Sequence, residues 1–314
     1  MENKVRKNKA MKKLTLILLL LITFEMLSPK FVYTQEELGL IIIAHGSPMA
    51  QWNIPVLELE EEVKRIMSER NNNPFNEIRV ALMEFNEPSI NTAIKDLENA
   101  GVDKVYAITL FIAPSGHSLY DIPTILGLYS DKEMIERIKE EGTTTIDTKM
   151  KITIGPSLNV GEVLKEVMLD RVGKLSTTPD SEGVVLLAHG DARFEPIWGS
   201  VCREIGSYIC AGTGINYFDY AFVEIGQSFI LEGAPVILKT ADKCKKTIVV
   251  GLYLAMSVED MAQNSILDVG EMKIESKEIF AGKKIHFSKQ SILPDKRISE
   301  WIVDRALEWA ERMK

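Results

Sequence analysis

The sequence predicts an α/β protein built of two tandem lobes, each a four-stranded parallel sheet flanked by helices. Two observations predict this fold class. From residue 36 onward, short apolar runs alternate with longer segments of helical periodicity. The same order of segments then recurs in the second half of the chain. Strands that alternate with helices form parallel sheets through right-handed connections.

The first lobe is expected over residues 36–175. Its strands are predicted at the apolar runs 38–44, 78–83, 105–112 and 150–154. Its helices are predicted at 54–67, 88–100 and 160–173, with Pro88 in the first turn of the second helix and Gly101 just past its end. We expect the strand order 2-1-3-4, which makes the first and third strands neighbours.

The second lobe is expected over residues 183–314, because three motifs of the first lobe recur there in the same order. Segments 41–46, 81–84 and 110–113 are echoed at 185–190, 221–224 and 252–255, at offsets of 144, 140 and 142 residues. Segments 285–287 and 298–312 correspond to the fourth strand and the closing helix. An internal duplication is the simplest interpretation, and residues 176–183 have the composition of a linker between the copies.

Residues 1–34 differ in kind from the rest of the chain. Six basic residues up to Lys13 precede the apolar run 14–24, and Glu25 ends that run. This pattern is typical of a secretory signal, and the run is shorter than the roughly 20 apolar residues of a transmembrane helix. We predict a signal peptide cleaved after Thr34, with an uncleaved membrane anchor as the alternative. In both cases we expect the body of the protein outside the cytoplasmic membrane, in the periplasm or another extracytoplasmic space.

Charge and cysteine content exclude some classes of function. Beyond residue 34 the chain has 30 Lys and Arg against 43 Asp and Glu. Nucleic-acid binding requires a basic face that neutralises phosphates, so this balance argues against a nucleic-acid partner. Cys202, Cys210 and Cys244 have no Cys-x-x-Cys spacing, which argues against a zinc site or a disulfide framework. We interpret them as packing residues, with a disulfide from one of the first two to Cys244 left open.

Three polar side chains follow the predicted strands of the first lobe. His45 comes directly after the first strand, Glu84 after the second, and His117 a few residues past the third. Ligands of open parallel sheets bind outside the carboxyl ends of the strands, and neighbouring strands lie about 4.8 Å apart. Imidazole and carboxylate are good ligands for Co²⁺, Ni²⁺, Fe²⁺ and Zn²⁺. The sequence therefore predicts a divalent-metal site at one rim of the first lobe.

The neighbours of these residues fit a binding site. Gly46 permits a tight turn after His45, and Gly116 lies in a loop whose backbone can approach a ligand closely. The hydroxyls of Ser47, Ser115 and Ser118 are candidates for binding polar substituents of that ligand.

Other interpretations of the same residues stay open. A histidine after a strand also serves as a packing or capping residue, and acidic residues such as Glu84 and Glu87 favour a helix N-terminus. His286 lies inside a predicted strand, and we interpret it as structural.

Four segments carry a resemblance to a known family: 43–47 (IAHGS), 83–90 (MEFNEPSI), 110–117 (LFIAPSGH) and 121–123 (DIP). They resemble the sirohydrochlorin cobaltochelatase family of the CbiX type, closely over residues 38–158 and weakly over 183–312. Members of this family are similar to ferrochelatase and have flavodoxin-like lobes. The resemblance implies insertion of a divalent metal into a tetrapyrrole such as sirohydrochlorin, with Co²⁺ first and Ni²⁺ or Fe²⁺ as alternatives. Neither ATP nor an organic cofactor is implied.

The resemblance also implies roles for single residues. His45 and His117 bind the metal, and one of them takes a pyrrole proton with Glu84 assisting. The macrocycle is expected in the cleft between the lobes. Because an internal duplication can substitute for a dimer, a monomer is favoured.

This chain departs from the family pattern at three points. Pro48 follows Ser47 where many members have arginine. The second lobe keeps His189 and Glu224, but Glu259 stands at the position equivalent to His117, so this copy is degenerate or has another role. The predicted export segment is unexpected for cobalamin or sirohaem synthesis.

The sequence thus leaves three hypotheses. The first is a tetrapyrrole chelatase. The second is an exported carrier or sensor that binds metal, haem or another tetrapyrrole without turnover, and it is motivated by the export segment and the degenerate second lobe. The third is a structural or interaction module in which the histidines serve packing.

Overall fold

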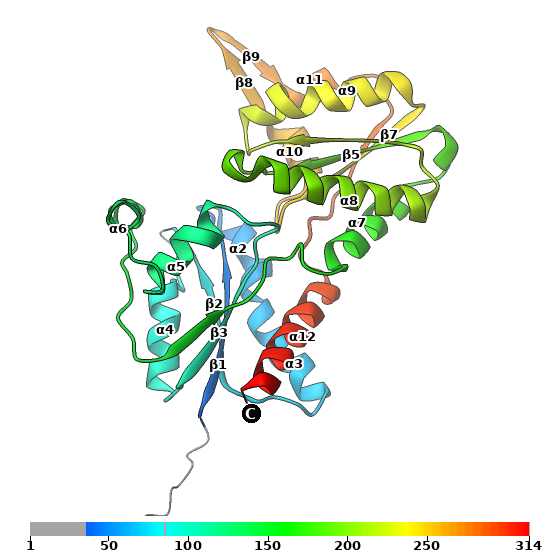
Figure 1. Ribbon diagram of the computed structural model, residues 1–314. Helices are drawn as coiled ribbons and strands as arrows, with labels where there is room; N and C mark the ends of the chain where they lie inside the picture. The colour runs from blue at the N-terminus through cyan, green and yellow to red at the C-terminus, as the bar shows by residue number, and fades with distance from the viewer. Residues whose placement is uncertain (1–35, 85, 314) are drawn as a thin grey trace, which may run out of the picture. The chain divides into compact units, whose positions relative to one another are not determined.

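The computed structural model describes residues 36–84 and 86–313, whose strands form two four-stranded parallel sheets and a two-stranded hairpin (Figure 1). The predicted signal or anchor segment and its cleavage site lie outside these residues. Within them, no helix has the length and apolar character needed to cross a membrane.

The first sheet has the order β2-β1-β3-β4, as predicted. Its strands are β1 (Leu38–Ala44), β2 (Phe75–Leu82), β3 (Lys104–Thr109) and β4 (Lys151–Ile154). All neighbours pair in parallel. Residues 39–44 of β1 are buried, because a central strand of a parallel sheet is covered on both faces by helices.

The helices of the first half differ from the prediction at several ends. They are α2 (Ala50–Leu57), α3 (Leu59–Glu69), α4 (Ile90–Asn99), the π-helical turn η1 (His117–Asp121), α5 (Ile122–Ile125), α6 (Lys132–Glu140) and α7 (Val163–Gly173). The single helix predicted at 54–67 is two helices that meet at Glu58. Pro88 lies outside α4, because the Ser89 side chain accepts a hydrogen bond from the Thr92 amide and caps the helix there. The sequence analysis predicted no element between residues 113 and 140.

The second sheet repeats the order of the first, with β6, β5, β7 and β10 at the positions of β2, β1, β3 and β4. Its strands are β5 (Glu182–Ala188), β6 (Tyr217–Phe222), β7 (Lys246–Leu252) and β10 (Ile285–Phe287). The helical segments of this half are η2 (Pro179–Ser181), η3 (Ala192–Phe194), α8 (Glu195–Thr213), η4 (Phe229–Gly233), α9 (Ala234–Lys243), α10 (Val258–Asn264), α11 (Ser276–Ile279) and α12 (Lys296–Arg312). The hairpin of β8 (Ile266–Val269) and β9 (Met272–Glu275), which the sequence analysis missed, is inserted before β10. The predicted linker, 176–183, folds as η2 and the start of β5.

The two halves exchange their last helices. Helix α12 packs against α3 and β3 of the first sheet, whereas α7 packs against α8 and β7 of the second (Figure 1). Trp309 of α12 stacks on Tyr106 of β3, with ring centroids 5.2 Å apart. The segments 36–175 and 183–314 are therefore interleaved in space.

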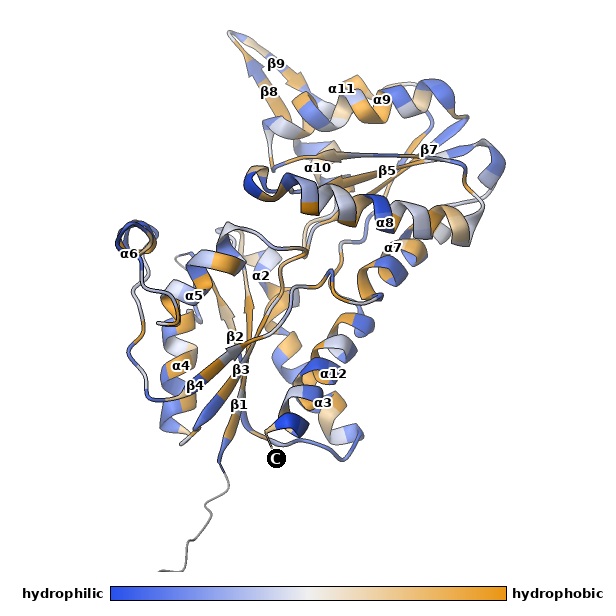
Figure 2. Ribbon diagram, in the orientation of Figure 1, coloured by the Kyte–Doolittle hydropathy of each residue, from blue (hydrophilic) through white to orange (hydrophobic). Residues whose placement is uncertain are grey.

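The hydrophobic core follows from this exchange. One cluster of buried side chains contains residues of both sheets together with α7, α8 and α12. Two smaller clusters lie on the other face of each sheet. Figure 2 shows the same pattern: the strands are largely hydrophobic, and the helices alternate between hydrophobic and hydrophilic faces. The three cysteines are free, and Cys202 is part of the shared core.

Candidate metal centre

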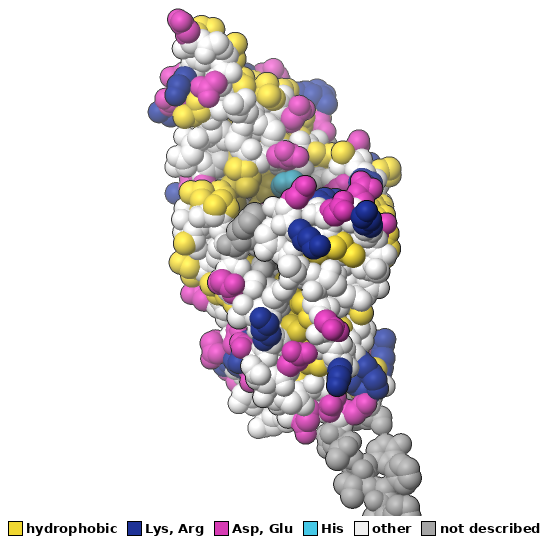
Figure 3. Space-filling view, turned by 90° about the vertical axis from the view of Figure 1, so that its left-hand side faces the viewer, with side chains coloured by type: hydrophobic (Ala, Val, Ile, Leu, Met, Phe, Trp, Pro, Cys, Tyr) yellow, Lys and Arg dark blue, Asp and Glu magenta, His cyan; other side chains and the backbone are white. Residues whose placement is uncertain are grey.

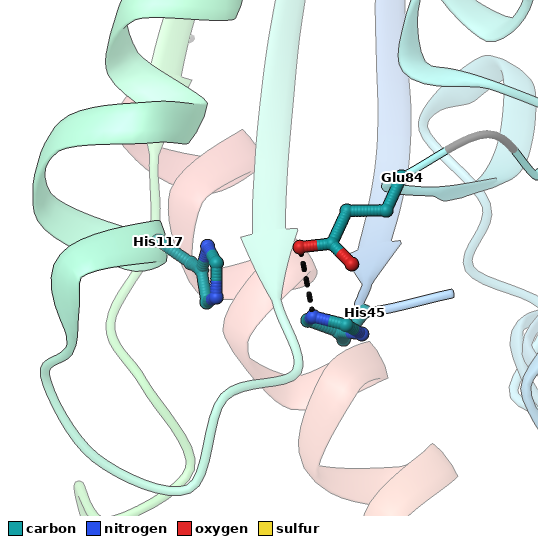
Figure 4. A group of neighbouring side chains, drawn as sticks. All are labelled: His45, Glu84 and His117. Atoms are coloured by element: carbon teal, nitrogen blue, oxygen red, sulfur yellow. Dashed lines mark ion pairs between the residues drawn. The ribbon is translucent and has the colours of Figure 1, made fainter. Parts of the chain in front are cut away.

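The three side chains predicted to meet at the rim of the first sheet do so (Figure 4). His45 directly follows β1, Glu84 lies two residues past β2, and His117 begins η1, eight residues past β3. Each offers one ligand atom, and these atoms lie within 4.8 Å of one another. Their convergence is observed, and their role as metal ligands remains a prediction.

The cluster is open to solvent on one side. The His45 Nε2 atom lies 3.1 Å from Glu84 Oε1, and the side chains are 46% and 33% exposed. The imidazole rings of His45 and His117 meet edge to face, with centroids 5.2 Å apart. Figure 3 shows a histidine in a hollow of the surface, with hydrophobic side chains to its left and acidic ones above and to its right. A cation bound here would keep coordination positions free for a second ligand.

A pair of asparagines fixes the loops that carry His45 and Glu84. Asn53 donates to the Ser47 carbonyl at 2.9 Å and to Asn86 Oδ1 at 3.0 Å, and its own Oδ1 accepts from the Ser47 amide. Asn86 in turn donates to the Glu84 carbonyl at 2.5 Å. This network holds Glu84 at a φ of 55°, a left-handed conformation that costs free energy outside glycine. Asn86 lies in the segment 83–90 that carries the family resemblance, but no role was predicted for it or for Asn53.

Gly46 is needed for close packing rather than for an unusual turn. A Cβ atom at this position would collide with the Met83 carbonyl and the Asn86 side chain. Gly46 is absent from the positive-φ glycines of the described residues, so the expected tight turn is not the reason for glycine here. The Gly46 carbonyl also accepts a hydrogen bond from His45 Nδ1 at 2.6 Å. This contact directs His45 Nε2 toward Glu84.

His117 is oriented by a buried carboxylate. Its Nδ1 atom lies 2.7 Å from Asp121 Oδ2, and the Asp121 side chain is 1% exposed. The other Asp121 oxygen forms an ion pair with Arg137 of α6. A carboxylate that accepts the Nδ1–H of a histidine fixes the tautomer and leaves Nε2 as the free ligand atom. Asp121 lies in the segment 121–123 that carries the family resemblance, but no role was predicted for it. Arg137 was not predicted as a supporting residue, because no helix was expected at 132–140.

The electrostatics distinguish the two histidines. The hydrogen bond with Glu84 raises the pKa of His45, although burial opposes the rise, and the same bond lowers the pKa of Glu84. Burial lowers the pKa of His117, and the neighbouring His45 lowers it further. His117 is therefore neutral near neutral pH and offers a lone pair, whereas His45 keeps its proton, beside Glu84, to higher pH than a solvated histidine does. A cation at the cluster takes the place of that proton.

The other predicted binding residues are mostly engaged within the protein. Ser115 and Ser118 are buried, and their hydroxyls bond to each other and to the loop backbone. The Ser47 hydroxyl accepts from the Met49 amide at 3.1 Å. The Gly116 amide donates to Asp191 of the second half at 2.9 Å. Contact of these four residues with a ligand remains a prediction.

The second half has no equivalent of the cluster in the part of the chain that the structure describes. His189 repeats the backbone contact of His45, since its Nδ1 lies 3.0 Å from the Gly190 carbonyl. Glu224 is exposed, and Glu259 of α10 lies 3.5 Å from Lys289. His286 is exposed on β10, where it lines a separate cavity of about 530 Å³.

Residues 39–175 match the family model named CbiX. The sirohydrochlorin cobaltochelatase of Methanococcus maripaludis is 38% identical over 91 residues, which cover 29% of this chain and 59% of that protein. The sirohydrochlorin cobaltochelatase of Saccharolobus solfataricus is 27% identical over 137 residues, which cover 44% of this chain and 94% of that protein. These alignments therefore take in less than half of the present chain.

Solved structures match both halves. SirB from Bacillus subtilis with Fe³⁺ superposes with a TM-score of 0.61 at 14% identity, covering 87% of this chain and 95% of that one. The sirohydrochlorin chelatase SirB from Bacillus subtilis subspecies spizizenii in complex with cobalt gives 0.57 at 14% identity, covering 88% and 96%. These likenesses confirm the predicted two-lobed α/β fold. The segment that carries His45, Glu84 and His117 is the one matched by the family model, so this part of the chain is similar to CbiX.

Proposed function

We propose that this protein inserts a divalent metal ion into a tetrapyrrole such as sirohydrochlorin, without ATP, and that Co²⁺ is the preferred ion, with Ni²⁺ and Fe²⁺ as alternatives. One observation carries the proposal: two imidazoles and a carboxylate meet at an open rim within the segment matched by the family model. The names of the aligned relatives support the substrate and the metal.

The cluster has the groups that metal insertion requires. An M²⁺ ion that enters a free macrocycle replaces two pyrrole protons, so a base must lie beside the ion. His45 and His117 hold the ion through Nε2. As the ion passes to the macrocycle, Glu84 accepts one pyrrole proton, and the Nε2 atom that the ion leaves on one of the histidines accepts the other. Two imidazoles and one carboxylate leave the ion free coordination positions for the macrocycle nitrogens, which a closed four-cysteine cage would not.

Exposed hydrophobic side chains that follow strands of both sheets suit a macrocycle with apolar faces. Met49 and Leu119 follow β1 and β3, and Ile197 and Ile225 follow β5 and β6, all between 41% and 55% exposed. The loops after β3 and β5 touch, because the Gly116 amide donates to Asp191. The carboxyl ends of both sheets thus border one space, where we place the macrocycle.

The test is metallation of sirohydrochlorin by Co²⁺, followed by absorbance. We expect His45→Ala to lower the initial rate on the order of 10²-fold or more, because a metal ligand beside the base is lost. The matched control is His286→Ala, since His286 is exposed on β10 and lines a separate cavity. An active His45→Ala protein, or equal losses in both variants, would contradict the proposal.

A second candidate function is an exported carrier that binds metal or tetrapyrrole without turnover. The signal-like pattern of residues 1–34 and the absence of a second cluster from the described part of the other half favour it. We propose an extracytoplasmic location for either function. Multiple turnovers per protein molecule exclude the carrier, whereas one-to-one binding without metallation over hours supports it.

A further inference from the structure

The charged groups near the metal cluster are mainly acidic, and the nearest arginine on the first half is already engaged. Glu141 is close enough to raise the pKa of both histidines. Arg137 forms ion pairs with Asp121 and Glu141. These two carboxylates neutralise the charge of Arg137, so we do not expect Arg137 to bind an anionic ligand.

The second half brings a free guanidinium to this rim. Of the arginines that the structure describes, all except Arg193 and Arg203 are in ion pairs with carboxylates. Arg193 is exposed, and its guanidinium forms no hydrogen bond or ion pair with the described residues; it lies over the ring of Tyr120, whose centroid is 5.5 Å from Cζ. Tyr120 belongs to η1, the turn that begins at His117.

Asp191 fixes this segment to the loop of His117. Its Oδ2 atom accepts from the Gly116 amide at 2.9 Å, and its Oδ1 atom accepts from the Arg193 amide at 2.9 Å. Trp198 adds a third link, since its Nε1 donates to the Pro114 carbonyl at 3.0 Å. Arg193 is therefore held beside η1 by its backbone, while its guanidinium lies over an aromatic face.

An exposed guanidinium that lies over an aromatic ring and has no ion pair within the described residues is suited to bind a carboxylate ligand. Arginine binds carboxylates through two parallel hydrogen bonds, and stacking on an aromatic ring keeps the planar group oriented. We propose that Arg193 binds a peripheral carboxylate of the tetrapyrrole, so that the second half supplies a substrate-anchoring residue to the metal centre of the first. The inference rests on the proposed function and names its substrate class: a macrocycle with acidic side chains.

The experiment measures macrocycle binding without turnover. A porphyrin with acetate and propionate side chains and the same porphyrin as its methyl ester are titrated, in one detergent, into the wild type, Arg193→Gln and Arg193→Lys. We expect Arg193→Gln to weaken binding of the acid porphyrin roughly 10- to 100-fold, because a charge-assisted hydrogen bond is lost. The affinity of Arg193→Lys for the acid porphyrin should lie between those of the wild type and Arg193→Gln. All three proteins should bind the methyl ester with the same affinity.

Arg203→Gln is the matched control, since it removes the same charge from an exposed arginine of the same half that contacts Tyr220 instead of a carboxylate. Co²⁺ affinity and the thermal midpoint should stay unchanged in Arg193→Gln, which separates anchoring from a distorted His117 loop. Acid-porphyrin binding by Arg193→Gln within twofold of the wild type, or an equal loss in Arg203→Gln, would overturn the assignment. A wild type that binds neither porphyrin overturns the tetrapyrrole function as well.

Discussion

At the scale of single residues, a proton and a metal ion compete for His45. The Glu84 carboxylate raises the pKa of His45 above its usual value of about 6.5, so the apo cluster holds a proton at pH values where a solvated histidine would be losing its own. Metal binding must displace that proton. The affinity for Co²⁺ should therefore increase as the pH rises through the raised pKa of His45. It should decrease as the pH falls below that pKa.

Calorimetric titration with Co²⁺ in buffers of different ionisation enthalpy checks this. We expect about one proton released per ion just below the raised pKa of His45. Glu84→Gln should bind Co²⁺ more weakly and move the pH midpoint downward, because the group that raises the pKa is gone. An unchanged midpoint in that variant would show that Glu84 does not control the proton.

Asp121 is predicted to act on the metal through His117. We expect Asp121→Asn to lower Co²⁺ affinity roughly 10- to 100-fold, because the amide no longer fixes the imidazole tautomer. The change in affinity is measured by equilibrium titration at fixed pH. Asp260→Asn is the control, since Asp260 accepts from Ser257 in the second half, away from the cluster. Equal affinities of Asp121→Asn and the wild type would remove Asp121 from the site.

The candidate ligand residues could be predicted from the sequence, whereas the residues that hold them in place could not. His45, Glu84 and His117 could be predicted because each follows an apolar strand run, and parallel strands bring their carboxyl ends to one edge. Asn53 and Arg137 lie on helical segments far from the motifs in the chain. Their contacts depend on how α2 and α6 pack, which hydrophobic periodicity does not specify.

At the scale of elements, the exchange of α7 and α12 determines how the halves hold together. The helix at 296–312 could be predicted from its periodicity, but its partner could not, because an amphipathic face fits either sheet equally well. The β8–β9 hairpin and α6 were missed for a similar reason: short or strongly charged elements give little periodic signal.

Substitution of Trp309 tests whether α12 packs against the first sheet. It is 6% exposed and stacks on Tyr106 and Phe75 at centroid distances of 5.2 and 6.2 Å. Its Nε1 atom has no hydrogen-bond partner among the residues that the structure describes, so Trp309→Ala loses only apolar contact and cavity terms, about 3 kcal/mol in the free energy of unfolding. Trp309→Phe should cost much less, because stacking is kept. Urea unfolding gives both values, and an alanine variant as stable as the wild type would show that α12 does not pack on the first sheet.

At the scale of the whole molecule, Glu182 connects the second sheet to the segment that links the two halves. It is the first residue of β5, and its hydrogen-bond partners lie just before it in the chain. It is 2% exposed and accepts from the Ser176 hydroxyl at 2.5 Å and from the Thr177 and Thr178 amides at 2.9 and 3.0 Å. Lys246 lies 3.1 Å away. Burial opposes ionisation, but these groups outweigh it and lower the pKa of Glu182 to about 2.

The stability of the protein should therefore depend on this carboxylate. A folded-state pKa below the unfolded value of 4.5 contributes stability that is present above pH 4.5 and lost as the pH falls toward 2, about 3 kcal/mol in all. We expect Glu182→Gln to unfold at lower denaturant concentration at pH 7, with the difference from the wild type shrinking between pH 4.5 and 2. A difference that does not vary with pH in that range would assign the loss to packing alone.

The two-lobed fold as a whole could be predicted from the repeated order of strand and helix segments, and the strand order of both sheets agrees with it. The sequence already indicated that the second copy is degenerate or has another role, because Glu259 stands at the position equivalent to His117 although His189 and Glu224 are retained. It could not show that His189 and Glu224, among the described residues, would form no ion pair like that of His45 and Glu84, or that Glu259 would lie beside Lys289.

The central claim is that His45, Glu84 and His117 share one cation. Anomalous diffraction from crystals of the cobalt-loaded protein tests it most directly. We expect one strong cobalt peak, with the Nε2 atoms of both histidines and a Glu84 oxygen at about 2.0–2.2 Å. Cobalt bound elsewhere, or in contact with only one of the two imidazoles, would contradict the account.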